Sequence, residues 1–156
     1  MQFRSTPIMV TVCLLCLLAM PAWTKPNSSA SIPNAALIQP EELAAVLKNV
    51  TAPKPLILQV GFRILYAQAH IPGSEYAGPA NEAAGLRSLT QRVAALNRDT
   101  AIVIYCGCCP WSHCPNVAAA YGALHALGFD RVKVLHIADS FGENWVNRGY
   151  PVVRGG

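Results

Sequence analysis

The hydrophobic residues of the chain fall into short continuous runs separated by longer periodic segments. Runs rich in Val, Ile and Leu occupy residues 36–38, 54–60, 100–106 and 131–137. Apolar runs of this length, bounded by Pro, Gly or polar residues, are typical of strands buried on both faces. The run at 100–106 is the most hydrophobic of them outside the first 22 residues. The sequence therefore predicts a short strand at 36–38 and three stronger strands at the other runs.

Three segments between these runs place apolar residues three and four positions apart, which predicts amphipathic helices: 40–50, 83–96 and 115–127. Pro40 and Pro115 suit a first helical position, where a backbone N–H is not needed. Gly128 is placed to end the third helix. A short helix and an extended tail are expected after residue 141, with Trp145 in the core.

Alternation of strands and helices predicts an α/β fold of three layers, with a mainly parallel sheet covered by helices on both faces. Parallel strands put their carboxyl ends at one edge of the sheet. In open α/β folds, that edge is where ligands bind. The expected domain spans residues 36–153.

The first 22 residues differ from the rest of the chain. Arg4 is followed by an apolar stretch from about Pro7 to Met20 and then by small residues. This order predicts a secretory signal peptide over 1–22, cleaved between residues 22 and 30. Residues 23–35, rich in Pro, Ser and Asn, are expected to be a flexible linker. A secreted or periplasmic protein without a stable membrane span is therefore expected.

Charge excludes one class of partner. Beyond the predicted signal peptide, eleven basic and eight acidic residues remain, without a basic stripe interleaved with aromatics. Nucleic acid is therefore not an expected partner.

The six cysteines are unevenly distributed. Cys13 and Cys16 lie in the predicted signal peptide, and the other four lie within nine residues: Cys106, Cys108, Cys109 and Cys114. A secreted disulfide scaffold spreads its cysteines so that bridges join distant segments. A cluster confined to one strand-to-helix corner indicates local chemistry instead. Three interpretations remain open, namely a reactive sulfur site, a local disulfide and a metal site.

Cys106 ends the most hydrophobic of these strands, just before the loop that leads to the helix at Pro115. Backbone N–H groups lack partners at such a corner, and the helix dipole adds positive potential. This environment is expected to lower the pKa of Cys106 and make it a nucleophile. Residues 107–114 would supply the N–H donors that hold an anion or a terminal sulfur.

Five segments in order resemble the rhodanese-like (sulfurtransferase) domain superfamily: "LILQV" at 56–60, "YAQAHIPGS" at 66–74, "IVIYC" at 102–106, "LGFDRVKVL" at 127–135 and "WVNRGYPV" at 145–152. The resemblance implies a rhodanese-like fold. It also implies that Cys106 accepts a sulfane sulfur as a persulfide and passes it to a thiol. The implied partners are a small sulfur-containing substrate or a thiol acceptor protein, and no cofactor is implied.

The sequence also departs from the family pattern. Gln59, Val60 and Gly61 stand where the family usually has Asp-Val-Arg, and the loop from Gly107 to Cys114 is long and contains no Arg or Lys. Without a fixed cation, thiosulfate is expected to bind weakly. The missing Arg also argues against related phosphatases and arsenate reductases.

The remaining thiols, Cys108, Cys109 and Cys114, are candidates for relay or resolving groups that attack a sulfur on Cys106. Gly107, Trp111, Ser112 and His113 are expected to form the substrate-binding loop, with Arg63 and His70 as possible accessory residues. Two alternatives stay open. One is a thiol-disulfide redox protein. The other is a non-enzymatic module in which all four cysteines bind copper or zinc.

Overall fold

Five short strands form a single sheet at the centre of the molecule. A computed structural model describes residues 1–2 and 32–156, so residues 3–31, which hold most of the predicted signal peptide and linker, lie outside the described residues. The sheet order is β1-β5-β4-β2-β3, and every neighbouring pair is parallel. The strands are β1 (Leu37–Ile38), β2 (Leu56–Gln59), β3 (Glu75–Tyr76), β4 (Ile102–Tyr105) and β5 (Val132–Leu135). The predicted parallel sheet is confirmed.

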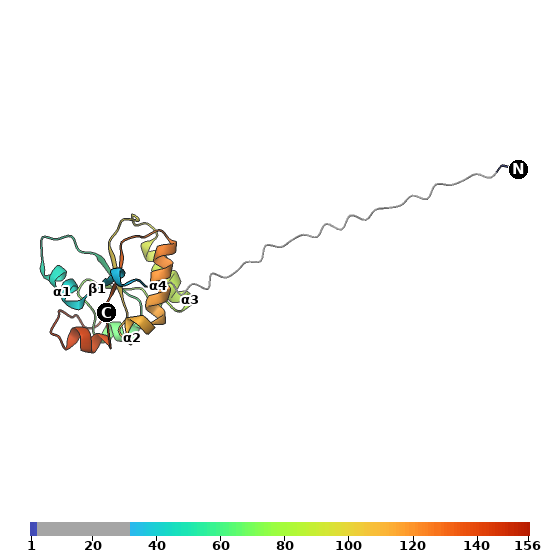
Figure 1. The fold of residues 1–156 in the computed structure, drawn as a ribbon. Coiled ribbons are helices and arrows are strands. Elements are labelled where there is room, and N and C mark those ends of the chain that lie inside the picture. Colours follow the sequence, from blue (N-terminus) through green and yellow to red (C-terminus); the bar gives the residue numbers. More distant parts are fainter. Residues whose placement is uncertain (3–31) are drawn as a thin grey trace.

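Helices cover both faces of this sheet (Figure 1). They are α1 (Pro40–Lys48), α2 (Arg63–Gln68), α3 (Ala83–Val93) and α4 (Pro115–Ala126), together with the 3-10 turns η1 (Asn34–Ala36) and η2 (Trp111–His113) and the π-helical turn η3 (Gly142–Val146). Helices α3 and α4 lie on one side, and α1 and η3 lie on the other (Figure 1). The three-layer α/β fold is thereby confirmed. The turn η1 includes Asn34 and Ala35, which the sequence assigned to the linker.

Strand β4 lies in the middle of the sheet, and all four of its residues are buried. Successive strand side chains point to opposite faces. Ile102 and Ile104 accordingly pack with α3 and α4, while Val103 and Tyr105 pack with α1 and η3. This double burial explains why the strand is apolar at every position. It also places the residue after Tyr105 at the centre of the carboxyl edge.

Helix ends follow the proline and glycine signals. Pro40 and Pro115 are the first residues of α1 and α4. Gly128 has φ +85°, a conformation that favours glycine, and its N–H bonds to the His125 carbonyl. The helix α4 ends at Ala126, one residue before the predicted end, and Leu127 is 37% exposed.

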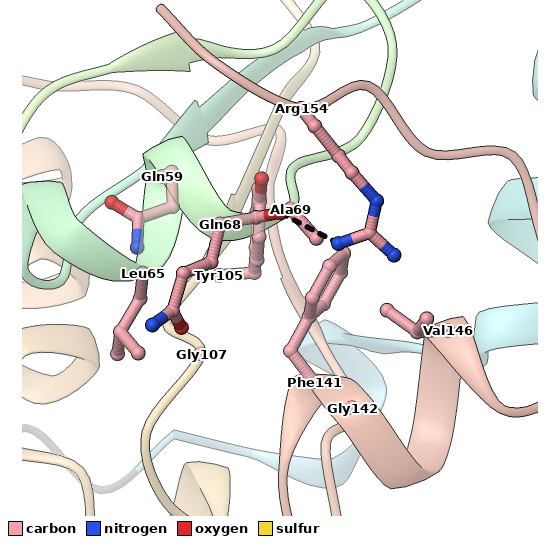
Figure 2. A pocket seen from close by; sticks show the side chains of 10 residues that line it. All are labelled: Gln59, Leu65, Gln68, Ala69, Tyr105, Gly107, Phe141, Gly142, Val146 and Arg154. Atoms are coloured by element: carbon pink, nitrogen blue, oxygen red, sulfur yellow. Dashed lines mark hydrogen bonds between the residues drawn. The ribbon is translucent and has the colours of Figure 1, made fainter.

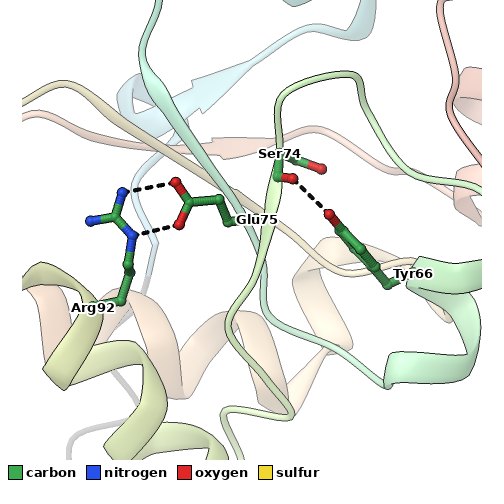
Figure 3. A network of polar contacts seen from close by, with 4 residues as sticks. All are labelled: Tyr66, Ser74, Glu75 and Arg92. Carbon is green, nitrogen blue, oxygen red and sulfur yellow. Dashed lines mark hydrogen bonds and ion pairs between the residues drawn. The ribbon is translucent and has the colours of Figure 1, made fainter. Parts of the chain in front are cut away.

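The edge strand β3 and helix α2 are elements that the hydrophobic pattern did not predict. Side-chain contacts hold this region in place (Figure 3). The Tyr66 hydroxyl of α2 donates to the Ser74 carbonyl at 2.7 Å. Arg92 of α3 forms a two-bond ion pair with Glu75 of β3. The guanidinium lowers the pKa of that carboxyl.

The C-terminal tail returns to the carboxyl edge of the sheet. Trp145 is fully buried, as predicted, and its Nε1 donates to the Pro151 carbonyl at 2.8 Å. Val153 then forms a two-way backbone bridge with His70, with both N–H to O distances at 2.9 Å. Among residues 1–2 and 32–156, no helix has the length and hydropathy needed to cross a membrane.

Candidate active site

Cys106 directly follows β4 and lies at the carboxyl edge of the sheet, between the ends of β5 and β2. It is only 2% exposed and packs within the core cluster on the α3 and α4 side, together with Val60 and Cys114. The predicted position of this cysteine is therefore the observed one.

Gly61 makes room for the Cys106 sulfur. A Cβ placed on Gly61 would collide with Cys106 Sγ, and it would lie 3.2 Å from Nε2 of Gln59. A side chain at residue 61 is therefore incompatible with the position of this sulfur. Gly61, which stands where the family's Asp-Val-Arg pattern has Arg, therefore leaves the space that the Cys106 sulfur occupies.

The loop brings the thiols close together without a bond between them. Cys106 Sγ lies 3.4 Å from Cys108 Sγ, and Cys108 Sγ lies 3.2 Å from Cys109 Sγ. All four are free thiols. Cys106 and Cys114 are buried, whereas Cys108 is exposed. The sulfur atoms therefore form a row that extends from the buried edge of the sheet to the protein surface.

Hydrogen bonding makes the Cys106 thiol unusually acidic. Its pKa is lowered from 9.0 to about 6, chiefly because the Cys114 thiol donates to it, and less through the N–H of Cys108, the Cys108 thiol and the N–H of Gly107. Burial opposes this shift. At neutral pH the group is therefore mostly a thiolate.

The pKa values of the neighbouring thiols shift in the opposite direction. Burial, then the contacts with Cys109 and Cys106, raise the pKa of Cys108 to about 12. The pKa of Cys114 is also raised, mainly because its thiol proton is held by Cys106. One thiolate is thus surrounded by thiols that keep their protons.

Fewer N–H groups of the loop are available to Cys106 than the sequence predicted. Three donors are used elsewhere in the loop and sheet: the N–H groups of Trp111, His113 and Cys114 bond to the carbonyls of Ile137, Pro110 and Trp111. These bonds build the turn η2 and dock it on the chain after β5. The N–H groups that act on Cys106 are those of Gly107 and Cys108.

Three of the cysteines are close enough together to share a metal ion. The sulfurs of Cys106, Cys108 and Cys114 all lie within 4.8 Å of one another. Cys109 is not part of this group, and its sulfur lies against Cys108 instead. A set of three thiolates suits Cu(I) or zinc. The four-sulfur set considered from the sequence is thus reduced to three.

The other predicted loop residues form the outer wall of the site. Trp111 is half-buried and packs against the α3 and α4 core, with its ring 6.1 Å from that of His136. Ser112 and His113 are exposed, and Ser112 Oγ lies 2.9 Å from His113 Nδ1. The loop therefore presents an aromatic and two polar groups near the thiols.

The two predicted accessory residues lie on α2 and just after it. The Arg63 guanidinium stacks over the Tyr76 ring at 4.9 Å. The His70 ring stacks on Tyr66 at 3.9 Å, and its Nδ1 lies 2.9 Å from the Tyr66 carbonyl. These contacts fix Arg63 to the edge strand β3 and His70 to helix α2.

A cavity of about 240 Å³ lies at the same edge of the sheet, on the α1 and η3 side. Figure 2 shows the ten residues that line it: Gln59, Leu65, Gln68, Ala69, Tyr105, Gly107, Phe141, Gly142, Val146 and Arg154. Tyr105 and Gly107 flank Cys106 in sequence, but Cys106 itself is not in the lining. The sequence did not single out Arg154 or the cavity, because the tail brings Arg154 there only after folding.

The family model of the rhodanese-like domain matches residues 39–137. This match covers more than half of the chain, and the chain belongs to the rhodanese-like domain family. The comparison with curated proteins found no relative that matches.

Solved structures show the same fold. The rhodanese-like domain of the Alr3790 protein from Anabaena sp. is 20% identical, with a TM-score of 0.56, over 76% of this chain and 79% of that one. A protein from Helicobacter pylori, hp1203, is 16% identical, with a TM-score of 0.53, over 78% of this chain and 91% of that one.

The third neighbour is a larger protein. A variant of EanB, determined with a cysteine persulfide in a tetrahedral intermediate state with ergothioneine, is 20% identical with a TM-score of 0.56. The similarity covers 76% of this chain and 28% of that one. At these identities, the neighbours establish the fold.

Proposed function

We propose that the protein is a sulfurtransferase in which Cys106 accepts a sulfane sulfur as a persulfide and Cys108 relays it to an acceptor thiol. One observation carries the proposal: a buried, acidic thiol at the carboxyl end of β4 lies 3.4 Å from an exposed thiol. Membership of the rhodanese-like family supports it.

In the first step, the Cys106 thiolate attacks the outer sulfur of a donor persulfide. The S–S bond of the donor breaks, its electron pair leaves on the inner sulfur as a thiolate, and the outer sulfur stays on Cys106. The low pKa of Cys106 favours this step at neutral pH, because the thiolate is the nucleophile. Cys106 is 2% exposed, so the donor reaches it when the loop from Gly107 to Cys114 shifts.

In the second step, Cys108 attacks the outer sulfur of that persulfide. Cys106 leaves as a thiolate, and Cys108 gives its thiol proton to solvent as it attacks. The raised pKa of Cys108 keeps it protonated during the first step, so that Cys106 acts before it. Because Cys108 is exposed, the sulfur then lies where an acceptor thiol can take it.

Sulfur transfer in three variants tests the proposal. With a persulfide donor, Cys106→Ser is expected to lose sulfur transfer to both cyanide and a protein thiol. Cys108→Ser is expected to keep transfer to cyanide, a small acceptor, and to slow transfer to a protein thiol at least tenfold. Cys109→Ser is the matched control and should retain both. Transfer to cyanide that survives Cys106→Ser would rule the proposal out.

A second candidate function is favoured by the three sulfurs within 4.8 Å. In that case, Cys106, Cys108 and Cys114 would hold Cu(I) or zinc, and the site would not transfer sulfur. Native mass spectrometry after incubation with each metal separates the two functions. A stoichiometric adduct that is lost in Cys114→Ser and that blocks persulfide formation favours the metal site.

The thiol-disulfide alternative depends on the contact between Cys106 and Cys108. Bonding these sulfurs would require them to move from 3.4 Å to about 2 Å, with loss of two hydrogens to a partner disulfide. Reversible loss of two hydrogens, with no sulfur gained from any persulfide donor, would favour that function.

A further inference from the structure

One thiol of the loop lies against the sulfur atom that the proposed function loads. Cys108 Sγ is 3.4 Å from Cys106 Sγ, and both residues are free thiols. When Cys106 carries a persulfide, its own Sγ becomes the inner sulfur and the transferred atom becomes the outer one. Cys108 is therefore in contact with the atom that becomes the inner sulfur of the persulfide.

A thiol beside a persulfide has two reactions open to it, and they differ in the sulfur that is attacked. Attack on the outer sulfur moves that atom to Cys108, which is the relay step described above. Attack on the inner sulfur joins Cys106 to Cys108 in a disulfide and expels the outer sulfur as hydrosulfide. Both reactions break the same S–S bond, so the position of Cys108 decides between them.

Three neighbours surround Cys106 Sγ. Gly61 packs so closely that a Cβ on it would collide with the sulfur, the Cys114 thiol donates a hydrogen bond to it, and Cys108 Sγ lies in contact with it. An added outer sulfur cannot occupy the place of Cys108, so it bonds on another side of Cys106 Sγ. In thiol–disulfide exchange, the attacking sulfur approaches opposite the bond that breaks. Cys108 is thus placed to attack the inner sulfur and to expel the outer one.

Closing a disulfide between these two residues requires only a short movement. The sulfurs would approach from 3.4 Å to the S–S bond length of about 2 Å. Gly107, the single residue between them, carries no side chain that would oppose the approach, and Cys108 is exposed. The loop can therefore bring the two sulfurs together without repacking the core.

We propose that the loaded site also releases its sulfur as hydrosulfide when no acceptor thiol is present, with Cys108 as the attacking group. This inference rests on the proposed function. The Cys108 sulfur bonds to Cys106 Sγ, the S–S bond of the persulfide breaks, and its electron pair leaves on the outer sulfur. The proton of the Cys108 thiol ends on that sulfur. One persulfide anion and one thiol thus give one disulfide and one hydrosulfide, and the persulfide itself is the oxidant.

Exposure selects Cys108 over the other two loop thiols. Cys114 is also close to Cys106, but it is buried and its thiol proton is held by Cys106. Cys109 lies against Cys108 and is outside the group of three neighbouring sulfurs. Cys108 is the thiol that both contacts Cys106 and reaches the surface.

The same exposure indicates how the site is regenerated. In a disulfide between a buried Cys106 and an exposed Cys108, an external dithiol reaches the Cys108 sulfur. Its first thiolate bonds to Cys108 and releases Cys106 as a thiolate, and its second thiol then frees Cys108 by closing the reductant's own disulfide. A full cycle converts a donor persulfide and a dithiol into a donor thiol, sulfide and the disulfide of the reductant. The added activity is therefore reduction of persulfides to sulfide.

The test follows loaded protein after the donor is removed. The protein is loaded with a persulfide donor without oxygen, desalted, and followed by intact mass and by a sulfide assay. The gain of one sulfur is expected to change, on the order of an hour, into a loss of two hydrogens relative to the reduced protein, with one sulfide released per chain. Peptide mapping should find a disulfide between Cys106 and Cys108. Dithiothreitol should restore the reduced mass and permit a second round of loading and release.

Two variants assign the attacking thiol. Cys108→Ser is expected to keep the added sulfur on Cys106 and to slow sulfide release at least about tenfold, because the attacking group is absent. Cys109→Ser is the matched control, since it removes an adjacent loop thiol, and it should release sulfide like the unmodified protein. Release that continues undiminished in Cys108→Ser, or a disulfide that maps to Cys106 and Cys114, would overturn the inference.

Failure of the inference and failure of the proposed function give different results. If Cys108→Ser holds a sulfur on Cys106 and passes it to cyanide, while the loaded unmodified protein releases no sulfide, the proposed function stands and the inference is wrong. If no persulfide donor places a sulfur on Cys106 even in Cys108→Ser, the proposed function is wrong and the inference falls with it.

Discussion

Cys106 owes its acidity to particular neighbours rather than to a general field at a helix start. The largest contribution comes from the Cys114 thiol, and the N–H groups of Gly107 and Cys108 contribute less. Cys114 immediately precedes α4 and is itself buried. The helix therefore acts on Cys106 indirectly, because it fixes the residue that donates to the thiolate.

Peptide-resolved alkylation against pH tests this at residue 106. The pKa is lowered, so the reactive thiolate is lost as the pH falls through about 6 and is fully present above it. The alkylation rate is expected to rise to a plateau with a midpoint near 6. Cys114→Ala removes the main donor and should move the midpoint upward by about one to two pH units, since a hydrogen bond to a charged group is worth about 1.5–3 kcal/mol.

Cys114→Ser keeps a donor at this position and should move the midpoint less than Cys114→Ala does. Cys109→Ser serves as a control with an unchanged midpoint. A midpoint near 9 in the unmodified protein would contradict the assigned acidity of Cys106.

At the scale of elements, the site depends on how closely the ends of β2 and β4 approach each other. Gln59 is paired with Tyr105 in the sheet register. The chain continues past β2 through Val60 and Gly61, so that Gly61 lies against the Cys106 sulfur. The absence of a side chain at residue 61 is therefore a requirement of this particular arrangement of strand ends.

Gly61→Ala is expected to push the Cys106 sulfur out of its place, since the added methyl would overlap it. Overpacking of this kind costs about 1–3 kcal/mol in the free energy of unfolding, measured by chemical denaturation. Persulfide formation on Cys106 should slow at least tenfold. Gly142→Ala is a suitable control, because its Cβ would have an ordinary contact of 3.6 Å with Ser140 Oγ. Normal loading in Gly61→Ala would show that the close approach is not needed.

Elements that bury an apolar face were predictable from the sequence, and elements held by polar contacts were not. The strand from Ile102 to Tyr105 is apolar throughout, because it is covered on both faces. Strand β3 has only two residues and depends on the Arg92–Glu75 pair and the Tyr66–Ser74 bond. Such contacts join residues far apart in sequence and leave no periodic pattern.

At the scale of the whole molecule, the topology explains why the position of Cys106 could be predicted and that of Arg154 could not. Cys106 could be placed because it ends a buried strand, and the carboxyl edge of a parallel sheet is where loops converge. Arg154 could not be placed, since the tail reaches the cavity through contacts between residues far apart in sequence, such as the His70–Val153 bridge and the bond from Arg154 to the Gln68 carbonyl. The cavity also depends on Phe141, which directly precedes η3 and packs on Tyr105 with 5.3 Å between the ring centroids.

The fold also places the reactive thiol and the cavity on different faces of the sheet. Side chains alternate across β4, so Cys106 points toward α3 and α4, while Tyr105 lies on the side that holds the cavity. The exposed Cys108 lies between Cys106 and Cys109 in the row of sulfurs. Cys106 and the cavity therefore lie on opposite faces of the sheet.

The intact mass of the protein after exposure to a persulfide donor tests the central claim most directly. The protein without residues 1–22, incubated without oxygen and then desalted, is expected to gain the mass of one sulfur atom, located on Cys106 by peptide mapping. The gain should disappear in Cys106→Ser and on addition of cyanide. An unchanged mass, or a sulfur that maps to another cysteine and persists in Cys106→Ser, would contradict the assignment of Cys106 as the sulfur carrier.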